Sequence, residues 1–63
     1  MPLWQSELEQ AIQAGHSVQE SYVRLLDAIE SPDLRNVVRD LLLMEEMNEV
    51  LLRSLWSRNV QVA

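Results

Sequence analysis

The dipeptide Ser31-Pro32, near the middle of the chain, is the feature that most limits how this sequence can fold. Pro32 disfavours helical geometry at Ser31, so a helix arriving from the N-terminal side must end there. Ser31 is also a favoured N-cap residue, Pro32 is tolerated in a first helical turn, and Asp33 complements the helix dipole. The dipeptide therefore predicts the end of one helix and the start of another, with a very short connection.

A short connection between two helices makes them antiparallel neighbours. We therefore predict an all-α fold, an antiparallel two-helix hairpin that forms a single unit over residues 1–63. The first helix is expected at about 3–30, the turn at 31–32, the second helix at about 33–58, and a short tail at 59–63.

Apolar residues recur at heptad spacing in both helices, and this periodicity predicts which sides of the helices meet. The predicted seam contains Leu8, Ala11, Gly15, Val18, Tyr22, Leu25 and Ile29 in the first helix, and Leu34, Val37, Leu41, Met44, Asn48, Leu51 and Leu55 in the second. A second stripe lies one position further round each helix: Ile12, His16, Gln19, Val23 and Leu26, then Val38, Leu42, Glu45, Glu49, Leu52 and Trp56.

The second stripes predict self-association. A chain of 63 residues buries only about 60 % of its unfolded surface, and 0 Cys excludes disulfides and thiolate metal ligands. Stripes left in water would form the large apolar patch that soluble monomers avoid. Two hairpins packed together would cover them, so we expect a homo-oligomer in which hairpins assemble into a four-helix bundle.

Charge and hydropathy exclude two classes of partner. Ten acidic residues outnumber five basic ones, all Arg, for a net charge of −5. The arginines are interleaved with acids, so no continuous basic face is available for nucleic acid. No apolar run approaches the ~18 residues of a membrane span, and no secretory signal is visible. We expect a cytoplasmic protein that binds neither nucleic acid nor membranes.

Polar residues interrupt the second stripes at similar heights, with His16 and Gln19 in one helix and Glu45 and Glu49 in the other. Carboxylates and imidazoles inside helical bundles bind iron or manganese, so Glu45, His16 and Glu49 are candidate metal ligands. A buried polar layer can instead fix register and partner number. The carboxylates can also lie at a solvated rim, and a lone His is commonly a packed or hydrogen-bonded residue. These interpretations stay open.

Three segments resemble the ferritin-like superfamily, in particular its short hairpin forms, the rubrerythrin halves and the encapsulated ferritins. From the first to the last they span about half of the chain: Tyr22-Val23-Arg24-Leu25-Leu26, Ser31-Pro32-Asp33-Leu34-Arg35 and Met44-Glu45-Glu46-Met47-Asn48. The resemblance implies that two hairpins form a four-helix bundle around a di-iron centre. Glu45 matches the Glu of the family's Glu-x-x-His motif, but Asn48 stands in place of the His. Gly15 lies at or beside the position of the first-helix Glu, with His16 the nearest substitute, so the ligand motif is degenerate.

Nucleophilic catalysis has no evident constituents, because the chain has no Cys and its single His shares a helix with the nearest serines, Ser17 and Ser21. Ferroxidase activity is the only enzymatic activity that the sequence suggests. We predict a small non-enzymatic helical-bundle protein that needs no cofactor and forms a homodimer or a higher oligomer. Two alternatives are a ferritin-like protein that binds iron or manganese at the bundle mid-plane, and an adaptor for an amphipathic helix of a partner protein.

Overall fold

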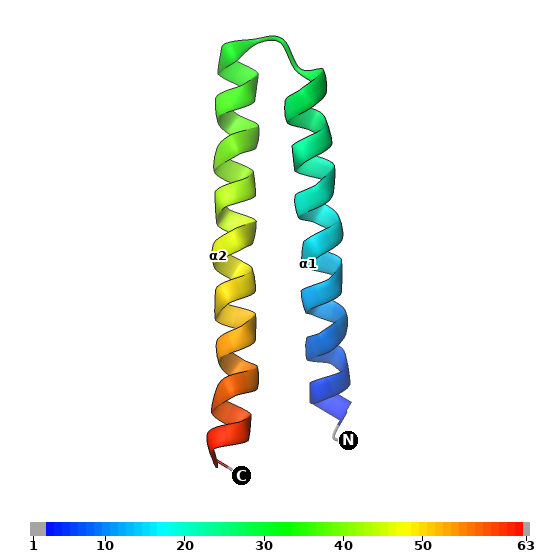
Figure 1. Cartoon of the computed structure of the whole chain (residues 1–63), viewed down its shortest axis with the longest axis vertical. Coiled ribbons are helices and arrows are strands. Elements are labelled where there is room, and N and C mark those ends of the chain that lie inside the picture. Colours follow the sequence, from blue (N-terminus) through cyan, green and yellow to red (C-terminus); the bar gives the residue numbers. More distant parts are fainter. Residues whose placement is uncertain (1–2, 63) are drawn as a thin grey trace.

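The computed structural model describes the backbone of residues 3–62 and the side chains of residues 4–58. Two helices, α1 (Leu3–Ala28) and α2 (Pro32–Val62), lie side by side and antiparallel (Figure 1). The described residues contain no strand, so the predicted all-α hairpin is confirmed. α1 ends before the predicted position near residue 30, and α2 continues through residues 59–62, which the sequence had placed in a tail. Neither helix, within the described residues, has a stretch long and apolar enough to cross a membrane.

Ser31 starts α2 in the way that the sequence predicts. Its carbonyl oxygen accepts a hydrogen bond from the Arg35 backbone N–H at 2.9 Å. Its side-chain hydroxyl accepts a second one, from the Leu34 backbone N–H, at 3.5 Å. The first contact is the first backbone hydrogen bond of the helix, and the second satisfies an N–H group that a helix start otherwise leaves unpaired. Pro32 then takes the first helical position.

A side chain of α2 caps the C-terminal end of α1. The Arg35 guanidinium reaches back across the turn and donates hydrogen bonds to the backbone carbonyl oxygens of Leu26 and Ile29, the second at 3.1 Å. The last carbonyls of a helix lack partners within it, and the negative end of the helix dipole attracts a cation. This contact, which the sequence analysis did not foresee, fixes the two helices to each other at the turn.

The structure corrects the predicted seam. α2 faces α1 with its second stripe, in which Val38 is buried and Leu42, Glu45, Glu49, Leu52 and Trp56 are half-buried. The predicted seam of α2 is exposed, with exposed fractions of 38–62 % for Leu34, Val37, Leu41, Met44, Leu51 and Leu55. On α1 the prediction is correct for Leu8, Gly15, Tyr22 and Ile29, whereas Ile12, Gln19 and Leu26 replace Ala11, Val18 and Leu25 against α2.

The polar residues at mid-length explain why α2 turns this way. Both stripes of α2 are apolar enough to pack against α1, so specific contacts with α1 residues decide which stripe faces it. Glu49 receives a hydrogen bond from Gln19 of α1, and rotating α2 to the predicted face would break it. Glu45 also faces α1, because a Cβ atom added at Gly15 would lie 4.0 Å from the Glu45 Oε2 atom, at ordinary contact distance.

The hairpin is a single layer of helices. Its Cα atoms span 48 × 15 × 11 Å, and among the described side chains only Leu8 and Val38 are buried, with exposed fractions of 6 % and 8 %. Domains usually consist of two packed layers around one core. Here one broad side of the layer carries the unused heptad stripes, and we call it the open apolar face: Ala11, Val18 and Leu25 of α1 with Leu34, Val37, Leu41, Met44, Asn48, Leu51 and Leu55 of α2.

Replacing the guanidinium at the turn should destabilise the protein. We expect Arg35→Ala to lower the free energy of unfolding by about 1–2 kcal/mol, because two carbonyls at the end of α1 lose a charged donor. Urea unfolding at one fixed protein concentration measures this. Arg39→Ala is the matched control, since Arg39 is exposed and makes no hydrogen bond or ion pair within the described residues. Equal losses in the two variants would contradict this role of Arg35.

Candidate functional site

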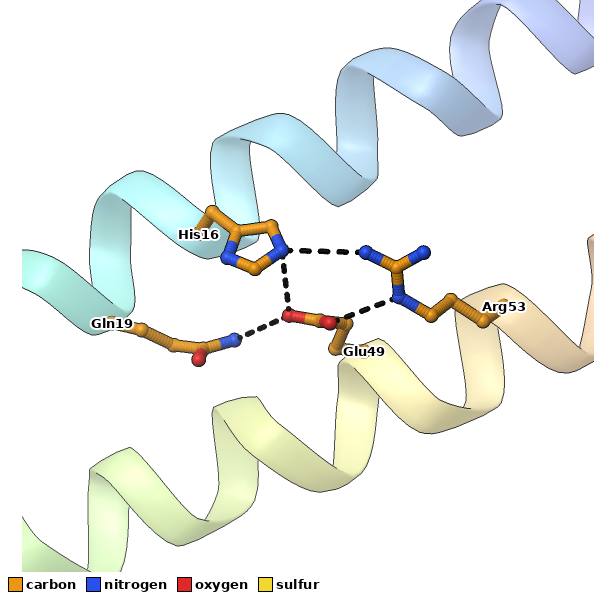
Figure 2. A network of polar contacts seen from close by, with 4 residues as sticks. All are labelled: His16, Gln19, Glu49 and Arg53. Carbon is orange, nitrogen blue, oxygen red and sulfur yellow. Dashed lines mark hydrogen bonds and ion pairs between the residues drawn. The ribbon is translucent and has the colours of Figure 1, made fainter.

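Four polar side chains, two from each helix, meet around the Glu49 carboxylate (Figure 2). Gln19 Nε2 donates a hydrogen bond to Glu49 Oε1 at 3.0 Å, and His16 Nε2 lies 3.1 Å from the same oxygen. Arg53 Nε donates to Glu49 Oε2 at 2.9 Å, while Arg53 Nη2 lies 3.4 Å from His16 Nε2. We call these four residues the polar cluster.

Helical spacing brings the polar cluster together. Glu49 and Arg53 are one turn apart on α2, the i,i+4 spacing that favours an ion pair, and His16 and Gln19 are three apart on α1. The Glu49 side chain is 20 % exposed, whereas those of His16 and Arg53 are 50 % and 57 % exposed. The carboxylate is therefore the innermost group, and the His16 and Arg53 side chains partly shield it from solvent at the margin of the helix interface.

The surroundings of Glu49 stabilise its charged form. The hydrogen bond from Arg53 lowers the pKa of the Glu49 carboxyl group most, and the hydrogen bond from Gln19 lowers it further. Partial desolvation acts in the opposite direction, while the charges of His16 and Arg53 add to the lowering. Glu49 is consequently ionised at neutral pH and links α2 electrostatically to α1.

Two of the three candidate metal ligands come together, and the third stands apart. His16 and Glu49 are in contact, but Glu49 already shares both of its oxygens with Gln19, Arg53 and His16. Glu45 instead lies beside Gly15. Within the described residues, no group of three or more His, Asp or Glu side chains is arranged to hold a metal ion. Binding of iron or manganese stays a prediction from the sequence.

Arg53 is the member of the cluster that the sequence analysis missed. Arg39, Glu46 and Arg53 follow one another at seven-residue spacing and form a wholly polar line along α2, which is typical of a solvated side. The signal that could have found it is its i,i+4 spacing from Glu49, since a carboxylate near a helix interface needs a cation or a donor. The predicted alignment of His16, Gln19 and Glu49 at one height, in contrast, is confirmed.

A second feature lies on the open apolar face. A groove of about 710 Å³ runs between the helices, and its polar lining residues are Glu45, Asn48, Glu49, Ser54 and Arg58. Mostly small residues of α1 form one wall, and larger residues of α2 form the other: Ala11, Ile12, Ala14, Gly15 and Val18, then Leu51, Leu52 and Leu55. The polar cluster borders a different hollow on the other flank, lined by Glu9, Gln13, His16, Arg53, Trp56 and Ser57 among others. The groove is therefore lined mostly by apolar residues, whereas the second hollow is lined mostly by polar ones.

Comparison with known proteins gives no match for this chain among family models, curated proteins or solved structures. The resemblance to the ferritin-like superfamily therefore stays a prediction. The geometry of the chain itself supplies the functional argument: the polar cluster joins α1 to α2, and the groove offers apolar surface to a further helix.

The lowered pKa of Glu49 predicts how stability depends on pH. A carboxyl group whose pKa is lower in the folded state stabilises the fold above its unfolded-state pKa, and this contribution disappears as pH falls through the folded-state pKa. We therefore expect wild type to be more stable than Glu49→Gln at pH 7, and the difference to shrink towards zero as the pH falls from 7 through the folded-state pKa of Glu49.

Urea unfolding over this pH range measures the difference between the two proteins. The matched control is Glu46→Gln, an exposed carboxylate on the same helix that makes no hydrogen bond or ion pair within the described residues. A stability difference for Glu49→Gln that does not change with pH would show that charge on Glu49 is not the cause.

Proposed function

We propose that this protein is a non-enzymatic assembly module, a helical hairpin that self-associates into a four-helix bundle. The area of its exposed surface carries the proposal. The chain exposes 4923 Å², whereas a compact monomer of 7.3 kDa exposes roughly 4,200 Å². The excess of roughly 700 Å² is close to the ~800 Å² that each partner buries in a typical specific interface.

The chemistry of the exposed surface supports the same proposal. Val37, Met44 and Leu51 on the open apolar face have exposed fractions of 57 %, 62 % and 57 %. Burying an apolar side chain completely contributes about 1.5–3 kcal/mol, so each of these half-exposed side chains offers roughly 1 kcal/mol to a partner that covers it. A heptad row of such side chains provides a substantial driving force for association.

The breadth of the apolar surface of α2 points to a helix inside an assembly. Leu43, Met47 and Val50 lie outside the open apolar face, yet they are 58 %, 59 % and 61 % exposed. A helix that is apolar around most of its circumference is normally buried on several sides, and α1 covers only one. Every copy of the chain carries the same face, so a second copy is a ready partner with a self-complementary surface.

Sedimentation at micromolar concentration tests the proposal, and we expect wild type to be a dimer or larger. Leu51→Glu should weaken association by roughly a hundredfold or more, because the bundle would bury an unpaired charge. Leu51 is 57 % exposed in the hairpin, so the variant leaves an isolated hairpin nearly unaffected. Ser17→Glu, at an exposed position outside the open apolar face, is the matched control and should retain the wild-type mass. A folded wild-type monomer at this concentration would refute the proposal.

A further inference from the structure

We propose that the second copy covers the open apolar face in an antiparallel arrangement, with a two-fold axis at the level of Asn48 and Gly15. α2 then packs against the partner's α2, and α1 packs against the partner's α1, so the four helices form a square bundle. This inference rests on the proposed self-association and adds the face, the orientation and the register of the contact. Three independent features of the chain lead to the same axis.

Asn48 is the first feature, because it is the single polar residue in the heptad stripe of α2 on the open apolar face. An amide buried at a helix interface requires hydrogen-bond partners. A two-fold axis at this position brings it against the partner's Asn48, and each amide supplies both donors and an acceptor. Glu45 lines the same groove and has no hydrogen bond within the described residues, so these amides also offer it donors.

Side-chain size is the second feature. At the level of Asn48, the wall of the groove on α1 is made of small residues, Ala11, Ala14 and Gly15. An antiparallel crossing here sets Ala14 against the partner's Gly15, and interaxial distance shortens where side chains are small. On α2 the same axis sets Leu41 opposite the partner's Leu55 and Met44 opposite the partner's Leu51, so apolar residues meet apolar residues.

Charge is the third feature, and it selects the antiparallel orientation. Asp40 and Arg58 are 18 positions apart, about five helical turns, so both lie on one line along the edge of the open apolar face. Neither has an ion-pair partner within the described residues. Antiparallel packing around Asn48 brings Asp40 beside the partner's Arg58, and symmetry forms this pair twice. A parallel dimer would instead place Asp40 level with the partner's Asp40.

Charge reversal tests the orientation. Asp40→Arg and Arg58→Asp should each weaken the dimer by roughly tenfold or more at low salt, because like charges then meet at two symmetric contacts. The double variant restores opposite charges and should return the dissociation constant to within about threefold of wild type. The matched control, Arg39→Asp, lies on the polar line of α2 and should leave association unchanged. Sedimentation equilibrium measures the dissociation constants, and circular dichroism checks that each variant is helical.

Disulfide mapping tests the register without altering charge. The chain has 0 Cys, so Leu41→Cys/Leu55→Cys introduces the only thiols. Within one chain these positions are about 21 Å apart along α2, far beyond the ~7 Å that a disulfide allows between Cα atoms. Mild oxidation should therefore link position 41 to position 55 of the partner. Cleavage after arginine separates the two positions into different peptides, so mass spectrometry identifies which ones are joined.

The outcomes separate this inference from the proposed function. A dimeric wild type that yields 41-to-41 and 55-to-55 links, or a double charge reversal that fails to restore association, overturns the antiparallel arrangement and leaves self-association intact. A folded wild-type monomer overturns both, including the case in which that monomer binds an added amphipathic helix. Links from 41 to 55, together with restoration by the double variant, support the inference.

Discussion

The ionised Glu49 carboxylate takes hydrogen bonds from Gln19 on α1 and Arg53 on α2, and it lies 3.1 Å from His16. Turning this carboxylate away from α1 would break its hydrogen bond from Gln19 and its contact with His16. Its position therefore fixes the rotation of α2 about its own axis. The same rotation directs Val38 towards α1 and leaves Met44 on the open apolar face.

The polar residues at mid-length consequently divide between two sides of the hairpin. Glu49 belongs to the polar cluster and holds the two helices together. Glu45 and Asn48 line the groove, and neither side chain makes a hydrogen bond within the described residues. The sequence suggested one polar layer, with metal binding and register as alternative roles. This division favours a role in fixing register over a role in metal binding. Glu49 already has its hydrogen-bond partners within the hairpin, whereas Glu45 lies where a second copy would supply them.

The hinge could be predicted from the sequence because its causes are local. Pro32 and Ser31 act on their own backbone neighbours, and antiparallel pairing then sets His16 and Glu49 at one height by residue counting alone. The face of α2 could not be predicted in this way. Its two heptad stripes differ by one position and are both apolar, so the choice depends on side-chain contacts across the interface. The Arg35 contact is similar, since a long side chain reaching over a turn leaves no periodic signal.

Gly15 connects the fold of the hairpin with its proposed self-association. A glycine within a helix costs about 1 kcal/mol relative to alanine, so its place in the middle of α1 needs a compensating contact. The hairpin alone does not require a glycine there, because a Cβ atom at this position would lie 4.0 Å from the Glu45 Oε2 atom, an ordinary van der Waals contact. With only Leu8 and Val38 buried, the hairpin gains little against the conformational entropy of ordering its residues. In the self-association that we propose, folding and association are linked equilibria, and a residue that weakens α1 alone would stabilise the assembly by letting a second α1 approach.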